Sequence, residues 1–149
     1  MKIIEKTNGL NRITKIVSAL SRLKIDVGFF GGEKNNKNEL TLATVAKINE
    51  YGSLEGKIPA RPFIRMTLSR NNQFRRELKS ALKESLYDLN NVSGPFSQFG
   101  INAMQEIQRE FTIGEFIENS FSTIKKKKSS SPLMDMGQLR RAVSWRIKR

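Results

Sequence analysis

Residues 48–53 have the sequence INEYGS, and residues 58–65 have the sequence IPARPFIR. Ahead of the first segment, Thr41 is a residue type that caps helix N-termini, and the apolar residues after it recur at helical spacing. Gly52 suits the position just past the end of a helix, where a left-handed backbone is common. The sequence therefore predicts a short helix that ends at Tyr51 and leads into a turn.

Two prolines determine the geometry of the second segment. Pro59 and Pro62 fix their own φ angles and bias the residues before them toward extended geometry, so this segment cannot be helical throughout. We expect a rigid turn that holds Arg61, Phe63 and Arg65 in defined directions.

The two arginines of this turn leave two interpretations open. Arg61 and Arg65 can form salt bridges, either with Glu50 or with an adjacent subunit. They can also be solvated charges, which contribute about 0–1 kcal/mol to stability.

The composition excludes several classes of function. The chain has 149 residues, and we expect residues 1–149 to form a single domain with a modest core. It has no cysteine and no histidine, which removes disulfides, most zinc sites and the usual catalytic triads. It also has no apolar run of about 18 residues and no signal-like start. We therefore expect no enzyme activity, no catalytic residue, no cofactor, no metal and no membrane partner.

The charge is strongly positive and unevenly distributed. The formal net charge is +13, which favours phosphate or an acidic protein as a partner. Between Lys125 and Arg149 there are nine basic residues and one acidic residue, Asp135. We interpret residues 119–131 as a basic loop. Its lysine run, residues 125–128, can face DNA, contact an acidic partner, or be disordered in the free subunit and become ordered on assembly.

Apolar residues three and four positions apart predict three further helices. The first contains the stripe from Leu10 to Leu23, with Asn8 as its expected N-cap. The second extends from about Leu68 to Asn90, and the third from about Ser97 to Phe111.

Two segments have the character of strands. They are Ile25 to Phe30 and Ala142 to Ile147, the second within a C-terminal strand region at about 142–148. Glu33 to Glu39 is polar enough to be a hairpin tip or a flexible arm. We predict an α+β fold with a small antiparallel sheet of at least three strands. This sheet would pack against two or three helices, with extended loops for subunit contacts.

Short motifs follow one another in a specific order along almost the whole chain. They are Val27-Gly28, Ala46, Glu50-Tyr51-Gly52, Pro59 to Arg65, Thr123-Ile124, Pro132-Leu133, Asp135, Gly137 and Leu139-Arg140. In this order and spacing the chain resembles the tail-completion or neck family of tailed bacteriophages, also called head-to-tail joining or minor tail proteins. It departs from the family pattern at Met136, where threonine is usual, and in the lysine run, where a single Lys-Gly is usual.

The resemblance implies a structural protein of the virion. It implies a homo-oligomeric ring, commonly a hexamer, that joins the tail tube to the head-closure complex as a connector. The partners would be the tail tube or tail terminator protein and the head-closure or adaptor proteins. Genomic DNA would pass through the ring with transient, non-specific contact. The protein would reside in the virion neck, and in the host cytoplasm during assembly.

A ring is a head-to-tail assembly, so each subunit must present two different complementary surfaces. The residues that we expect at a subunit or partner interface are Glu50, Tyr51, Arg61, Phe63, Arg65, Asp135 and Arg140. The residues that we expect to face DNA or an acidic partner are Lys125, Lys126, Lys127, Lys128 and Arg141.

Two other functions are weighed by the same residues. Asp135-Met136-Gly137 superficially resembles the Asp-Thr-Gly of aspartic proteases, but those enzymes need two such carboxylates, and the chain has one such loop without the hydroxyl. The alternative function is a small basic protein that binds DNA non-specifically, with an affinity that falls steeply with salt. The chain shows no recognition helix after a tight turn, which argues against a sequence-specific DNA reader.

The C-terminal strand gives a test of the predicted fold. Truncation after Pro132 removes this strand together with Trp145, so we expect a lower midpoint of thermal unfolding and a loss of assembly. An unchanged midpoint would show that the C-terminal region is not part of the core.

Overall fold

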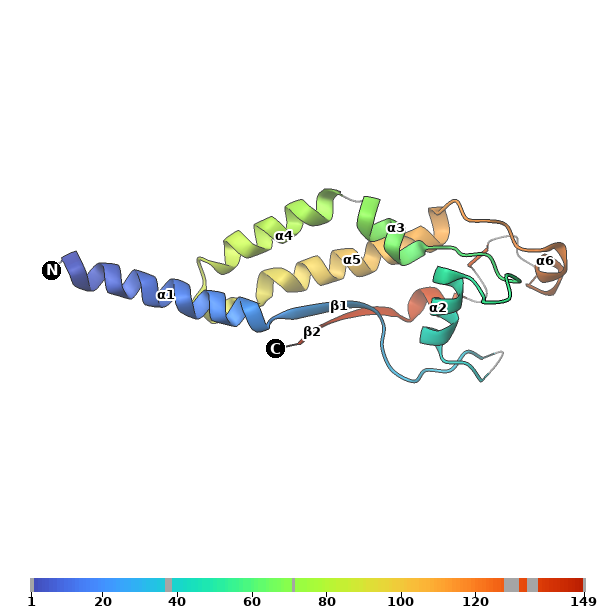
Figure 1. The fold of residues 1–149 in the computed structure, drawn as a ribbon, viewed down its shortest axis with the longest axis horizontal. Helices are drawn as coiled ribbons and strands as arrows, with labels where there is room; N and C mark the ends of the chain where they lie inside the picture. Colours follow the sequence, from blue (N-terminus) through green and yellow to red (C-terminus); the bar gives the residue numbers. More distant parts are fainter. Residues whose placement is uncertain (1, 37–38, 71, 128–131, 134–136, 149) are drawn as a thin grey trace. The chain divides into compact units, whose positions relative to one another are not determined.

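The structure, a computed structural model, describes residues 2–36, 39–70, 72–127, 132–133 and 137–148. Within these ranges it contains seven α-helices, one short 3-10 helix and a two-stranded antiparallel sheet, which confirms the predicted α+β class (Figure 1). In chain order the elements are α1 (Lys2–Arg22), β1 (Lys24–Phe29), α2 (Leu42–Tyr51), α3 (Phe63–Arg70), α4 (Asn72–Ser85), η1 (Leu89–Asn91), α5 (Gly94–Ile113), α6 (Phe121–Lys127), α7 (Gln138–Arg141) and β2 (Val143–Lys148).

The chain divides into two compact units. The chain passes from one unit to the other between residues 71 and 72 and within β1, α5 and β2, so each of these three elements contributes residues to both units. That residues 1–149 form a single domain stays a prediction. Unit 1 consists of Met1–Asp26, Asn72–Asn102 and Trp145–Arg149, and unit 2 consists of Val27–Asn71 and Ala103–Ser144.

The sheet pairs β1 with β2. The two strands begin and end within one residue of the positions that the sequence predicts. The expected third strand is not found in the described part of the chain. There, the pairing outside the two strands is an isolated antiparallel bridge between Lys34 and Thr41, which is consistent with a hairpin at the polar loop.

An acidic residue of β1 pairs with two basic residues of β2. Asp26 Oδ2 lies 2.7 Å from Lys148 Nζ and 3.1 Å from Arg146 Nε. These two contacts, that of Lys148 first, lower the pKa of Asp26. Arg146 and Lys148 are two positions apart and therefore lie on the same face of β2.

Unit 1 has a small aromatic core. Phe74 of α4 is buried, and its ring meets that of Phe99 of α5 edge to face, with the centroids 5.9 Å apart. Trp145 of β2 lies against Gly100 of α5, where the Cβ of any other residue would collide with the indole. Because Gly100 has no side chain, the Trp145 indole can pack directly against the backbone of α5.

Helix α1 differs from its predicted form. It begins at Lys2 and continues through Asn8, so the predicted N-cap at Asn8 is wrong. Of its apolar stripe, Ile16 is buried, with 1% of its surface exposed. Leu10, Ile13 and Val17 are largely exposed, at 65%, 54% and 56%, whereas Leu20 and Leu23 are half-buried.

The single long helix predicted after the proline turn is two helices. Helix α3 ends at Arg70 and α4 begins at Asn72. Residue 71, between the two helices, lies outside the described residues. The apolar stripe that suggested one helix starts at Phe74, and its members as far as Leu82 belong to α4. Helix α4 ends at Ser85, so Leu86 and Leu89 lie beyond it.

The predicted basic loop is partly helical. Residues 121–127 form α6, so an irregular structure for these residues is wrong. The Ser120 carbonyl starts this helix, since it accepts hydrogen bonds from the N–H groups of Thr123 at 2.9 Å and Ile124 at 3.0 Å. Residues 128–131 lie outside the described residues.

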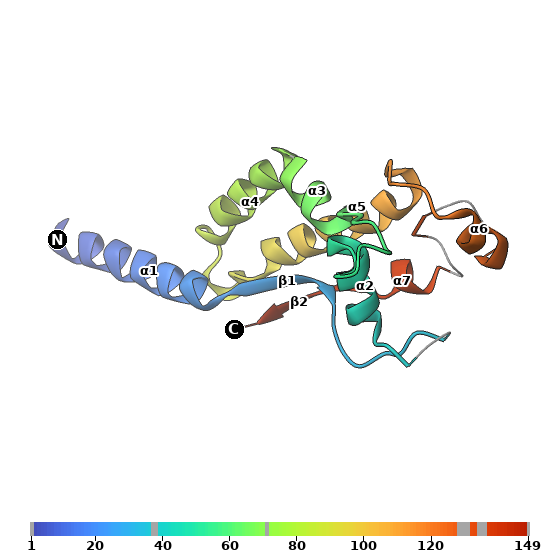
Figure 2. The same cartoon turned by 45° about the vertical axis from the view of Figure 1, so that its right-hand side comes forward.

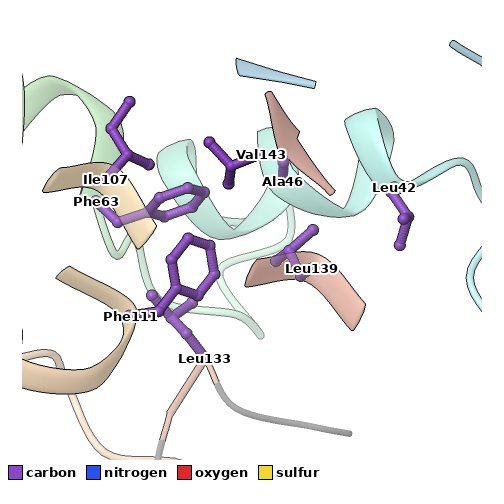
Figure 3. Close-up of a cluster of buried hydrophobic side chains, with 8 residues drawn as sticks. All are labelled: Leu42, Ala46, Phe63, Ile107, Phe111, Leu133, Leu139 and Val143. Carbon is purple, nitrogen blue, oxygen red and sulfur yellow. The ribbon is translucent and has the colours of Figure 1, made fainter. Parts of the chain in front are cut away.

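Phe63 is at the centre of the core of unit 2. Its side chain is fully buried, and its ring centroid lies 4.6 Å from that of Phe111 and 6.2 Å from that of Phe29. Figure 3 shows the rings of Phe63 and Phe111 beside each other, with aliphatic side chains around them. The buried cluster consists of Leu42, Ala46, Phe63, Ile107, Phe111, Leu133, Leu139 and Val143.

Replacement of this central ring should strongly destabilise the protein. We expect Phe63→Ala to lower the free energy of unfolding by about 3–5 kcal/mol, because it removes buried apolar surface and leaves a cavity. The matched control is Phe121→Ala at a ring that is 83% exposed, where the change should stay within about 0.5 kcal/mol. Equal losses in the two variants, measured by chemical denaturation, would contradict this account of the core.

Candidate functional site

Helix α2 begins and ends as the sequence predicts. The Thr41 hydroxyl accepts a hydrogen bond from the N–H of Thr44 at 3.2 Å. At the other end, Gly52 has a φ of 83°, and its N–H donates to the Ile48 carbonyl at 2.8 Å. A Cβ at this position would lie 3.0 Å from the Ile58 carbonyl oxygen. Glycine is therefore required both by the left-handed backbone and by the close approach of the turn.

The Glu50 side chain lies at the N-terminus of α3. It is buried, and its Oε2 and Oε1 atoms accept hydrogen bonds from the N–H groups of Ile64 at 2.9 Å and Arg65 at 3.0 Å. N–H groups in the first turn of a helix have no partner within that helix, and the helix dipole favours a negative charge there. Glu50, the last residue but one of α2, therefore caps α3.

Arg65 also forms an ion pair with the Glu50 carboxylate. Its Nε lies 3.0 Å from Glu50 Oε1, and its Nη2 donates to the Glu50 carbonyl at 3.2 Å. Its guanidinium carbon lies 4.7 Å from the centroid of the Tyr51 ring, a cation–π distance. Of the partners considered from the sequence, Glu50 is thus the ion-pair partner of Arg65 within the chain. Tyr51 itself is 61% exposed.

Arg61 is buried, with 4% of its surface exposed, and it joins the turn to the segment after α5. Its Nε donates to the Ile117 carbonyl at 2.8 Å, and its Nη2 lies 3.2 Å from both the Glu118 carbonyl and Asn119 Oδ1. Burial lowers the pKa of this guanidinium, which still carries its charge at neutral pH. In the described part of the chain its partners are oxygen atoms of neutral groups, and no ion pair with Glu50 is present.

A cavity of about 470 Å³ opens beside Arg61. Its wall carries two basic residues, one acidic residue, two hydroxyl groups and two asparagine side chains, next to two prolines and an isoleucine. The lining residues are Asn49, Lys57, Ile58, Pro59, Arg61, Glu118, Asn119, Ser120, Thr123 and Pro132.

The other predicted site residues have different positions. The Phe63 side chain is enclosed in the core of unit 2, so this structure does not present it to a partner. Arg140 and Arg141 are exposed on α7, and Lys125 is exposed on α6. Lys126 and Lys127 belong to α6, whereas Lys128 and Asp135 lie outside the described residues.

Sequence analysis missed two polar side chains that join distant segments. Gln138 Nε2 donates to the Lys34 carbonyl at 3.0 Å, and its Oε1 accepts from the Asn36 N–H at 3.1 Å. This contact lies at α7, which packs against α2 (Figure 2). The second is Asn119, whose Oδ1 atom accepts a hydrogen bond from Arg61 Nη2 at 3.2 Å. No spacing rule connects residues this far apart in the chain. For Gln138, only the knowledge that the polar loop and α7 are neighbours could have indicated the contact, and no sequence signal indicates Asn119.

Within the described ranges, no group of three or more acidic side chains is arranged to hold a metal ion. None of the described helices has the length and apolar character needed to cross a membrane. Comparison of the chain with protein-family models, curated proteins and solved structures found no match.

The Glu50 cap can be tested with a charge-neutral variant. Glu50→Gln leaves one acceptor oxygen and places an NH₂ group against helix N–H groups, so we expect the free energy of unfolding to fall by about 1–3 kcal/mol. The control is Glu55→Gln, which removes a carboxylate of the exposed pair with Lys57 at 2.6 Å. Its effect should be within about 0.5 kcal/mol. If urea denaturation gave the two variants the same stability, Glu50 would not be a structural cap.

Proposed function

We propose that this protein is a structural component of the head-to-tail junction of a tailed bacteriophage. In this role it forms a ring that joins the tail tube to the head-closure complex and lets the genome pass. It would act through binding surfaces and not through catalysis.

The carrying observation is that motifs from separate parts of the sequence meet in unit 2. Glu50 of the first motif caps the helix that starts in the second, which is the segment from Pro59 to Arg65. Leu133 and Leu139 of the later motifs lie in the same buried cluster as Phe63. Residues that carry a resemblance to one family are expected to cooperate in one fold if the resemblance is real, and this arrangement supports the proposal.

The exposed residues of this region suit a joining role. The Arg65 side chain is 55% exposed, and Tyr51 is 61% exposed beside it. Glu50 binds the Arg65 guanidinium, which in turn lies over the Tyr51 ring. Tyrosine and arginine are enriched at the energetic centres of protein interfaces, because they bring a large contact area and directional hydrogen bonds. A pre-organised pair of this kind loses little entropy when a partner binds.

The positive charge is consistent with weak contact to DNA. Lys125, Arg140 and Arg141 are exposed, so they are available to phosphate groups or to an acidic neighbour. Tight binding would hinder passage of the genome through a ring. We therefore expect attraction to DNA that is weak, non-specific and strongly reduced by salt.

The function is tested by deletion of the gene from the phage or prophage that carries it, with electron microscopy of the particles. We expect filled heads beside separate tails of finished length, and joined particles when the intact protein is supplied back. Normal infectious particles after the deletion would refute the joining role and favour the alternative of a non-specific DNA-binding protein.

A matched pair of variants refines the same experiment. Complementation with Tyr51→Ala should restore fewer joined particles than complementation with Tyr87→Ala, since only the first tyrosine stands beside Arg65. Tyr87 is 81% exposed and belongs to unit 1, so it controls for the loss of a surface tyrosine. Equal recovery with the two variants would exclude Tyr51 from the interface.

A further inference from the structure

Arg61 uses only part of its guanidinium for structural hydrogen bonds. Nε and Nη2 donate to Ile117, Glu118 and Asn119. Within the described residues Nη1 donates to no acceptor. It is not fully enclosed, so it can still be reached from outside. Arg61 is 96% buried, and a buried charge normally has all its hydrogen-bond donors satisfied. An accessible NH₂ group without an acceptor is therefore unusual.

The wall beside Arg61 also carries hydroxyl groups. The hydroxyl groups of Ser120, Ser122 and Thr123 form two hydrogen bonds with one another, of 3.1 Å and 2.9 Å. Each hydroxyl has one hydrogen, so three hydroxyls that share two bonds keep one hydrogen for another acceptor. Ser120 and Thr123 line the same cavity as Arg61. The Arg61 side chain thus lines a cavity whose wall also carries two hydroxyl groups, which can donate or accept hydrogen bonds.

The charges of the lining limit the ligand to one negative charge. Lys57 also lines the cavity, but its Nζ lies 2.6 Å from Glu55 Oε2, which offsets its charge. Glu118 brings a carboxylate to the same wall. A phosphate dianion or a polyanion would meet this like charge without a second uncompensated cation, whereas a single carboxylate needs only the one NH₂ group that Arg61 leaves accessible.

We propose that this cavity is a binding site for a single carboxylate, the side chain of an aspartate or glutamate in a segment of another polypeptide, and that Arg61 binds it. The apolar part of the wall, Ile58, Pro59 and Pro132, would contact the stem and backbone of that segment. The volume of about 470 Å³ is within the roughly 300–1,000 Å³ of ligand pockets, so it accommodates a side chain with its flanking peptide groups.

The test is a titration of the isolated, isotope-labelled full-length protein with blocked glutamate, N-acetyl-glutamate N-methylamide, at constant ionic strength. Blocked glutamine and inorganic phosphate serve as parallel probes. We expect saturable shifts of the Arg61 Nε–H resonance and of the Ser120 amide with blocked glutamate, and none with blocked glutamine. Equal shifts with the two blocked amino acids, or tighter binding of phosphate, would overturn the proposal. Because the wild-type Nε–H resonance is assigned through bonds, this result does not depend on any variant that fails to fold.

Two pairs of variants locate the site. Arg61→Gln should weaken binding by roughly tenfold or more, because it removes a charge-assisted hydrogen bond, whereas Lys47→Gln removes an exposed charge of the same unit and should leave binding unchanged.

Glu118→Gln should strengthen binding about two- to fivefold, since it removes the like charge from the wall. Glu115→Gln removes an equal charge three residues away and should have no effect, because Glu115 does not line the cavity. If Glu118→Gln and Glu115→Gln behaved alike, the carboxylate would not occupy this cavity. Since these titrations use the protein without phage components, their failure would leave the head-to-tail role standing, and normal particles after gene deletion would leave the carboxylate site standing.

Discussion

The buried carboxylate of Glu50 is the interaction on which the rest of unit 2 depends. A carboxylate that is taken out of water is costly unless hydrogen bonds and a positive charge replace its hydration. Here two N–H groups in the first turn of α3, at 2.9 Å and 3.0 Å, and the Arg65 guanidinium replace it. Because those groups belong to a different helix, the cap sets the end of α2 against the start of α3. That position brings Phe63 into the core.

A second buried charge extends the same arrangement. Arg61 lies between the Glu50 cap and the core ring of Phe63 in the chain, and it binds two carbonyls and an asparagine of the segment after α5. Its own N–H donates to the Asn49 carbonyl at 2.6 Å. The proline turn is thereby attached to α2 on one side and to residues 117–119 on the other. Rigid attachment of this kind keeps Tyr51, Arg65 and the cavity in a defined geometry without help from a ligand.

Sequence patterns predicted the elements that local physics controls. Thr41 and Gly52 end α2 where capping rules place them, and the alternation around Trp145 marks β2 correctly. The predictions of the long helix from Leu68 and of the basic loop were wrong. Leucines spaced along α4 suggested one helix from Leu68 to Asn90, yet α3 already begins at Phe63, directly after Pro62, and α4 ends at Ser85. The lysines after Thr123 suggested an irregular loop, yet α6 forms after Ser120 because side-chain hydroxyls and a carbonyl provide its first turn with partners.

The sequence by itself determined the α+β class, the two strands, the rigid proline turn and the identity of the residues that matter around it. Their roles were decided only by the tertiary structure. Nothing in the spacing of Glu50, Arg61 and Phe63 shows that the first caps a helix, the second binds carbonyl oxygens 56 and 57 positions away, and the third is the centre of the core. The reason is physical: propensity and periodicity act over a few residues, whereas the hydrogen-bond partner of a buried charge is whichever group the folded chain brings within about 3 Å.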